Sequence, residues 1–168
     1  MTRINRREAL CAALFSEYAG LPLVDAAEII RFDGADRLNA PETLRRVRAM
    51  SLQYPRAVIP GFYGANPDGT TALFPRNGSD ITGALVAAGM GASLYENWTD
   101  VPGLMTGDPA LCPDAKVIPE ISYADMQRLA KDGATRLHPD CLAPVESAGI
   151  PTRLKCTFTP GAPGTLIR

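Results

Sequence analysis

The stretch GSDITGALVAAGMGASLYENWTD, residues 78–100, joins a predicted helix to a predicted strand. Gly78, Ser79 and Asp80 precede an apolar run, residues 81–90, that is typical of a buried helix. The segment at residues 93–100 contains Tyr, Trp and Thr, which are residue types that favour strands. A helix followed directly by a strand is typical of an α/β fold.

The same alternation continues on both sides of this stretch. Apolar side chains at helical spacing, or residues typical of a helix start, predict helices at residues 6–19, 40–50, 123–131 and 140–148. Short apolar runs predict strands at residues 21–26, 56–62, 116–121, 152–158 and 164–168. These lengths predict an α/β domain with a mainly parallel sheet, which binds ligands outside the carboxyl ends of its strands. We therefore expect function in the loops after residues 62, 73 and 100.

The composition excludes several classes of protein. With 168 residues the chain can form one domain, and no apolar run is long enough to cross a membrane. The net charge of -1 provides no broad positive field for nucleic acid or an anionic membrane. Four cysteines without a CxxC spacing and a single histidine argue against a zinc site, so we expect no metal site and a reduced, cytoplasmic protein. The polar, basic start of the chain lacks the apolar region of a secretory signal.

The loop FPRNGSD, residues 74–80, is the first candidate site. The unpaired N–H groups at the start of the following helix favour an anion. Arg76 could hold a carboxylate through two parallel hydrogen bonds, and Asp80 could hold a lysine or a metal. The alternative, judged on this segment alone, is that Ser79 caps the helix and Arg76 lies on the surface.

Two acidic turns and a lysine form the second and third candidates. The turns at residues 99–103 and 106–109 follow a predicted strand and could wall a nucleotide pocket, although turn chemistry alone also explains their residue types. Lys116 is one of only three lysines and lies between an acidic, proline-rich loop and a predicted strand. A lysine in this place could neutralise phosphate oxygens as a mobile point charge.

Taken together and in order, these motifs resemble the aspartate kinases of the amino acid kinase superfamily. The resemblance extends from about Glu8 to the last residue, with the family's order and nearly its spacing. The matching stretches are VDAAEII (24–30), AVIPGFYGA (57–65), RNGSDITGALVAAG (76–89), YENWTDVPGLMTGDP (95–109), PDAKVIPEISYADM (113–126), GATRLHP (133–139) and PGTLI (163–167). The resemblance implies a three-layer α-β-α sandwich that transfers the γ-phosphoryl group of ATP, bound with Mg²⁺, to the β-carboxylate of L-aspartate.

The resemblance also implies which residues bind the amino acid. Arg76 would hold the α-carboxylate of aspartate, and Glu8 would hold its amino group. Ser79 and Asp80 would lie at the reacting end, where Asp80 would also orient the lysines beside the phosphates. Such groups only position the reactants and stabilise charge, which is most of what phosphoryl transfer requires.

The nucleotide-binding residues implied by the resemblance lie further along the chain. Thr99, Asp100, Thr106 and Asp108 would border the adenosine and ribose. Lys116 would bind the β- and γ-phosphates and is, with Ser79 and Asp80, one of the implied catalytic residues. No protein nucleophile is needed.

The chain departs from the family pattern at two glycines. The family's Ser-x-Gly-Glu is Asn-Arg-Arg-Glu at residues 5–8, and its Arg-Gly-Gly-Ser-Asp is Arg-Asn-Gly-Ser-Asp at residues 76–80. Both changes predict added bulk where a glycine lets the substrate approach. We also expect Tyr95 and Trp98 in the core, rather than stacked on a base.

A further departure concerns the family's Lys-Phe-Gly-Gly loop, which carries another phosphate-binding lysine and which this sequence lacks. We therefore expect residues 1–168 to form a single partial kinase domain, its nucleotide-binding half, without a regulatory ACT-type domain. The expected partner is a second polypeptide that supplies the amino-terminal half, or another copy of the chain, because an uncovered parallel sheet edge aggregates. The isolated chain is expected to be nearly inert. The alternative is a non-catalytic aspartokinase-like binding or interaction subunit, or a homologue that acts on another amino acid.

Overall fold

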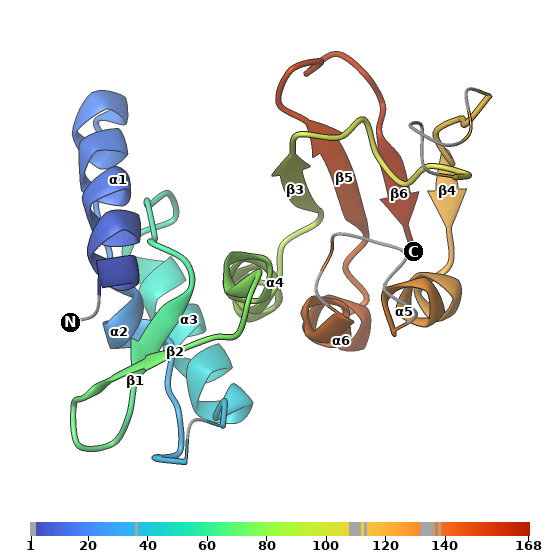
Figure 1. Cartoon of the computed structure of the whole chain (residues 1–168). Coiled ribbons are helices and arrows are strands. Elements are labelled where there is room, and N and C mark those ends of the chain that lie inside the picture. Colours follow the sequence, from blue (N-terminus) through green and yellow to red (C-terminus); the bar gives the residue numbers. More distant parts are fainter. Residues whose placement is uncertain (1–2, 36, 108–111, 113, 132–136, 138) are drawn as a thin grey trace. The chain divides into compact units, whose positions relative to one another are not determined.

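A computed structural model describes residues 3–35, 37–107, 112, 114–131, 137 and 139–168 (Figure 1). The chain divides into two compact units, the first ending at Met90 and the second beginning at Gly91. Within the described residues, none of the helices has the length and apolar character needed to cross a bilayer.

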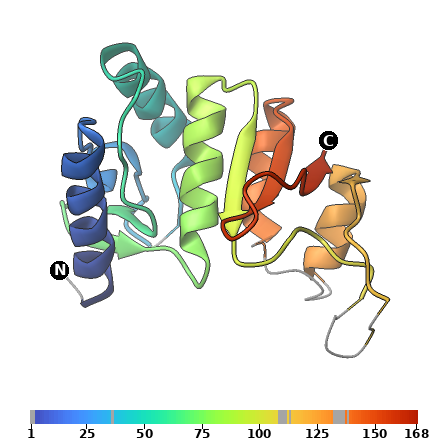
Figure 2. The same cartoon turned by 90° about the horizontal axis from the view of Figure 1, so that it is seen from above.

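The first unit is mostly helical. Its elements are α1 (Arg3–Ala19), α2 (Ala26–Ile29), α3 (Ala40–Gln53), β1 (Tyr63–Ala65), β2 (Thr71–Leu73) and α4 (Gly78–Met90). The predicted helices near residues 6–19, 40–50 and 81–90 are confirmed, and α3 and α4 pack side by side (Figure 1 and Figure 2). Strands β1 and β2 form an antiparallel pair.

Caps and buried hydroxyl groups fix the first-unit elements. Asn39 caps α3 by accepting a hydrogen bond from the Glu42 N–H (3.1 Å). Asp25 caps the short α2, and its Oδ1 also accepts a hydrogen bond from the Tyr63 hydroxyl (2.8 Å). Burial raises the pKa of Tyr63, and this hydrogen bond and the negative charge of Asp25 raise it further. The cap thus links α2 to the sheet.

Two strands predicted in the first unit are almost absent. The segments at residues 21–26 and 56–62 meet only at one parallel bridge, between Leu23 and Val58. Two hydrogen bonds hold them there, from the Val24 N–H to the Val58 carbonyl (2.9 Å) and from the Val58 N–H to the Pro22 carbonyl (2.8 Å). Proline has no N–H group, and each segment contains one, so neither segment supports a longer ladder.

The second unit contains a mixed four-stranded sheet. Its elements are β3 (Tyr95–Thr99), β4 (Glu120–Ile121), α5 (Tyr123–Lys131), the 3₁₀ helix η1 (Pro139–Cys141), α6 (Leu142–Ser147), β5 (Thr152–Cys156) and β6 (Thr165–Ile167). The strand order is β3-β5-β6-β4, in which β3–β5 and β4–β6 are parallel and β5–β6 is antiparallel. The chain therefore has the predicted α/β class, and the strand pairs in this sheet are mainly parallel.

Helix α5 is anchored to the sheet through its first residue. The buried Tyr123 hydroxyl donates a hydrogen bond to the Ile150 carbonyl and lies 3.1 Å from the Thr152 hydroxyl. Ser122 caps the helix as predicted, because its Oγ accepts a hydrogen bond from the Asp125 N–H (3.1 Å). The sequence pattern therefore located both the start and the end of α5.

Candidate functional site

The loop at residues 74–80 leads from β2 into α4 and allows no side chain at its fifth position. Gly78 is buried, and a Cβ atom there would lie 2.2 Å from the Cβ of Phe74. Phe74 is itself buried, and its N–H donates a hydrogen bond to the Phe62 carbonyl (3.0 Å). The start of α4 is therefore held by direct contact with the end of β2.

Asn77 has a left-handed backbone, with φ of +63°. Among residues with a side chain, Asn is one of the best tolerated in this region. Its carbonyl accepts a hydrogen bond from the Asp80 N–H (3.1 Å), which closes the turn into the helix. Asn77 replaces the family's glycine, and it therefore keeps a backbone conformation that glycine also adopts.

A strained residue lies directly behind the loop. Phe62 has φ of +79°, which is uncommon for a bulky side chain and persists only where the surroundings enforce it. Its N–H donates to the Thr82 hydroxyl (3.2 Å), which donates to the Gly78 carbonyl (3.1 Å). A Cβ on Gly61 would lie 3.0 Å from the Cβ of Ser79. The sequence offered no local signal for these supports, although strain of this kind often accompanies functional sites.

The structure brings three of the predicted residues of the first unit together on one turn. Arg76 and Ser79 are exposed and Asp80 is half-buried, so a guanidinium, a hydroxyl and a carboxylate lie at the start of α4. The 13-residue length of α4 gives it an appreciable positive N-terminal field. Glu8 is exposed on a different element, α1.

The first predicted turn of the second unit starts at the end of β3. The Thr99 carbonyl accepts hydrogen bonds from the N–H (2.9 Å) and the hydroxyl (3.1 Å) of Thr157, which follows β5. The Thr99 hydroxyl donates to Asp100 (3.2 Å). Since β3 and β5 are parallel, this turn lies at the carboxyl edge of the sheet, where α/β folds bind their ligands.

The structure joins Thr106 directly to Lys116. The Thr106 N–H donates to the Lys116 carbonyl (2.9 Å), and the Lys116 N–H donates to the Thr106 hydroxyl (3.0 Å). An antiparallel bridge between Met105 and Val117 extends this pairing. We call residues 104–106 and 116–118 the ribbon. The Lys116 side chain is exposed, and Asp108 lies outside the described residues.

One buried hydroxyl attaches the ribbon to the sheet. Thr165 of β6 is fully buried, and its Oγ1 accepts a hydrogen bond from the Leu104 N–H (2.9 Å) and donates one to the Ile118 carbonyl (2.7 Å). Gly103, with φ of +142°, lets the chain approach, because a Cβ there would lie 2.7 Å from this oxygen. Thr165 was not predicted as a supporting residue.

The expectation that Trp98 lies in the core is wrong. Its side chain is 44% exposed, and the Lys155 ammonium lies 4.8 Å from its ring centroid, a cation–π arrangement. The two residues are partners in the β3–β5 register, and side chains alternate between the faces of a strand. Trp98 falls on the exposed face, whereas Leu154 and Cys156 of β5 are buried.

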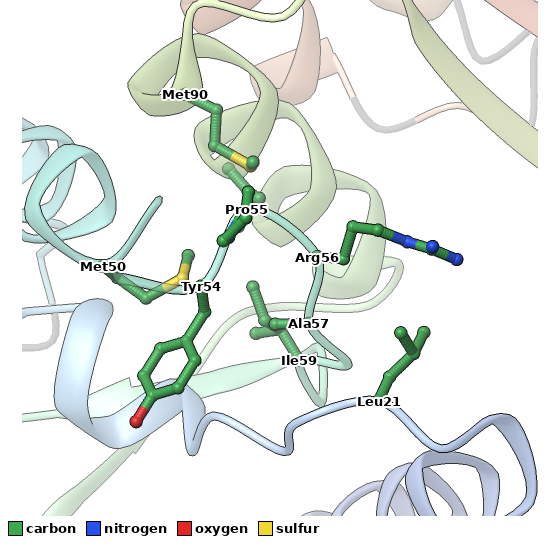
Figure 3. Close-up of a pocket in the computed structure, with 9 residues that line it drawn as sticks. Leu21, Met50, Tyr54, Pro55, Arg56, Ala57, Ile59 and Met90 are labelled. Atoms are coloured by element: carbon green, nitrogen blue, oxygen red, sulfur yellow. The ribbon is translucent and has the colours of Figure 1, made fainter. Parts of the chain in front are cut away.

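The first unit also has an apolar pocket that contains none of the predicted site residues (Figure 3). Its volume is about 300 Å³. The lining residues are Leu21, Met50, Tyr54, Pro55, Arg56, Ala57, Ile59, Val86 and Met90. Among the residues that the structure describes, no group of three or more His, Cys, Asp or Glu side chains could hold a metal ion.

Comparisons with known proteins identify one family. The model of the Amino acid kinase family matches residues 6–156. The bifunctional aspartokinase/homoserine dehydrogenase of Haemophilus influenzae is 41% identical over 127 residues, which are 75% of this chain and 16% of that protein. The aspartokinase of Chlamydia pneumoniae is 38% identical over 151 residues, which are 88% of this chain and 34% of that protein.

The solved structures that resemble this chain include enzymes of the same kind. The aspartate kinase of Clostridium acetobutylicum is 40% identical with a TM-score of 0.91, covering 97% of this chain and 38% of that one. Aspartokinase III of E. coli, in complex with aspartate and ADP, is 31% identical with a TM-score of 0.86, covering 95% of this chain and 38% of that one. The chain thus has the fold of the corresponding part of these enzymes, and it spans well under half the length of the relatives it matches.

Proposed function

This chain belongs to the amino acid kinase family, and on that premise we propose that it forms part of an aspartate kinase, which transfers the γ-phosphoryl group of ATP to the β-carboxylate of L-aspartate. The observation that carries the proposal is the likeness to the complex of E. coli aspartokinase III with aspartate and ADP, which extends over 95% of the chain. All three candidate segments lie within residues 6–156, which the family model matches. The proposal assigns the amino acid to the first unit and the nucleotide to the second.

The first-unit loop is suited to an acidic amino acid. Arg76 offers two parallel N–H donors, the geometry that matches a carboxylate. The Ser79 hydroxyl offers a further donor beside it, and the positive N-terminal field of α4 favours an anion there. In the proposed function Asp80 orients the cationic groups at the reacting end, and Glu8 on α1 receives the amino group.

The second-unit loops are suited to a nucleotide. The Thr99 and Thr106 hydroxyls and the Asp100 and Asp108 carboxylates would meet the hydroxyl-rich ribose and the base. Lys116 would offer a mobile ammonium group to the β- and γ-phosphates. Mg²⁺ prefers phosphate oxygens and water, with one or two carboxylates, to a cage of protein ligands, which fits these residues. Bound in this way, it would neutralise charge on the phosphate oxygens.

The complete reaction also requires residues beyond those described here. Lys116 supplies one cation, and phosphoryl transfer depends on several positioned positive charges. We propose that the rest of the catalytic domain is contributed by further polypeptide, and that residues 1–168 by themselves turn over slowly or not at all. They would form the nucleotide-binding portion of that domain.

Trapping the product with hydroxylamine tests this function. The chain is assayed with MgATP and L-aspartate, alone and mixed with a separately expressed polypeptide equivalent to the part of an aspartokinase that precedes the matched region. We expect hydroxamate from the mixture. Lys116→Ala should lower the rate about 100- to 1,000-fold. The control Lys131→Ala, which changes an exposed lysine on α5, should leave the rate unchanged. An assembled mixture that yields no hydroxamate would instead support a non-catalytic binding subunit.

A further inference from the structure

Thr82 lies one turn into α4 and belongs to none of the candidate segments. Its side chain is only 4% exposed. Among the buried residues that the structure describes in α4, it is the one with a polar side chain. Burial of a hydroxyl group is costly unless the group is hydrogen-bonded, so the partners of Thr82 indicate what it does.

The Thr82 hydroxyl joins two segments of the first unit. It accepts a hydrogen bond from the N–H of Phe62, which lies 20 positions earlier in the chain (3.2 Å). It donates a hydrogen bond to the Gly78 carbonyl in the first turn of α4 (3.1 Å). One buried oxygen therefore attaches the start of α4 to the backbone that leads into β1.

The backbone of Phe62 requires such a support. Its φ of +79° is unfavourable for a residue with a large side chain, and this conformation persists only where contacts hold it. The angle φ describes rotation about the bond from the backbone nitrogen to Cα. A hydrogen bond that fixes the direction of the Phe62 N–H therefore restrains the strained angle directly.

In this conformation, Phe62 and its neighbour lie against the loop at residues 74–80. A Cβ atom on Gly78 would lie 3.2 Å from Cδ2 of the Phe62 ring. A Cβ atom on Gly61 would lie 3.0 Å from the Cβ of Ser79. Because these contacts leave no space, a change in the backbone of Phe62 would displace the turn that carries the candidate residues.

We propose that Thr82 is a positioning residue for the amino-acid site. Its hydroxyl holds the strained backbone of Phe62, which in turn fixes the loop at residues 74–80 in the geometry that receives an acidic amino acid. This inference rests on the proposed function, in which that loop binds L-aspartate. A site that is ordered in advance loses less conformational freedom on binding, so the affinity for aspartate depends on Thr82 without direct contact.

Titration of the ¹⁵N-labelled chain with L-aspartate tests the role of Thr82, with the affinity measured from the amide resonances of residues 76–80. Thr82→Val keeps the shape of the side chain without its hydroxyl and should weaken aspartate binding about tenfold. Thr82→Ser retains the hydroxyl and should bind aspartate within about twofold of the wild type. The affinity for MgADP should be unchanged in both variants. If the valine variant does not fold, Thr82→Ala carries the same expectation.

The matched control is Thr43→Val on α3. Thr43 is fully buried, and its hydroxyl accepts a hydrogen bond from the Arg31 N–H (3.0 Å) and donates one to the Arg31 carbonyl (3.4 Å). The control therefore removes the same kind of hydrogen bonds from the same unit, but neither partner belongs to the loop. It should lower the free energy of unfolding and leave the affinity for aspartate unchanged.

The outcomes separate this inference from the proposed function. Aspartate binding as tight in Thr82→Val as in the wild type, or equally weakened in Thr43→Val, would overturn the role of Thr82 and leave the proposed function intact. A wild-type chain whose residues 76–80 do not respond to L-aspartate would refute the proposed function, and the positioning role with it.

Discussion

The loop at residues 74–80 and the ribbon of the second unit are held in place by different physical means. In the loop, close packing decides the conformation, because Gly78 has no room for even a methyl group and the backbone of Phe62 is strained. In the ribbon, two hydrogen bonds to one buried hydroxyl, that of Thr165, attach two segments to the sheet. The loop should therefore be sensitive to side-chain size and the ribbon to polarity.

The largest effect on stability is expected from added size in the loop. Gly78→Ala should lower the free energy of unfolding by about 3 kcal/mol, because the new Cβ would lie 2.2 Å from the Cβ of Phe74. Urea unfolding of the two proteins measures the difference. The control is Gly161→Ala, where no atom lies within 4 Å of the new Cβ. Equal losses in both variants would mean that packing does not fix the loop.

The corresponding change in the ribbon removes a hydroxyl at nearly constant volume. Thr165→Val should lower the free energy of unfolding by about 2 kcal/mol, because the Leu104 N–H and the Ile118 carbonyl lose their partner. Thr165→Ser retains the hydroxyl and should recover much of this loss in the same urea experiment. A valine variant as stable as the wild type would show that the two hydrogen bonds contribute nothing.

A smaller effect is expected from the backbone of Asn77. Asn77→Ala should lower the free energy of unfolding by about 1 kcal/mol, because alanine is poorly tolerated at φ of +63°. Asn77→Gly, which removes the side chain without this penalty, should stay within a few tenths of a kcal/mol of the wild type. If the glycine variant were the less stable of the two, the Asn77 side chain would matter more than its backbone conformation.

The smallest expected effect is a loss of stability at acidic pH. Hydrogen bonds from Arg45 and Arg46 lower the pKa of Glu42 in the first unit from 4.5 to about 2. The folded state binds this proton less readily than the unfolded state. The resulting stabilisation is therefore full above pH 4.5 and disappears as the pH falls through about 2. It is small because the group is solvated.

Comparing urea unfolding at neutral and acidic pH tests this prediction. Glu42→Gln should be less stable than the wild type at neutral pH, and the difference should vanish near pH 2. Glu96→Gln, on the exposed face of β3, serves as the control in the second unit. A Glu42→Gln difference that persists unchanged at the lowest pH would show that the ion pairs are not its source.

Local patterns predicted the helices better than the strands. The apolar periodicity of residues 6–19 and the Ser122 cap act within one or two helical turns, so the sequence displays them directly. Pairing of the segments around Leu23 and Val58 depends on partners 35 residues apart and on which N–H groups their prolines remove. Helix α2 has only four residues, too few for a periodic pattern.

In the candidate site, too, features that are local in the sequence were easier to predict than features that join distant residues. Arg76, Ser79 and Asp80 are neighbours in the sequence, so one turn necessarily brings them together. The attachment of the ribbon by Thr165 joins residues 47 and 61 positions apart, and a single threonine gives no local signal of such a role. Prediction from sequence therefore selected residues of the loops themselves, whose contact with a ligand stays a prediction, and missed the residues that hold these loops in place.

Backbone amide chemical shifts of the ¹⁵N-labelled chain test the central claim, that the two units bind different reactants. We expect MgADP to shift the amide resonances of Thr99, Thr106 and Lys116 and to leave those of residues 76–80 unchanged. L-Aspartate should shift residues 76–80 and leave the ribbon unchanged. If MgADP shifted only other resonances, such as those of the residues that line the apolar pocket of the first unit, the assignment of the nucleotide to the second unit would be contradicted.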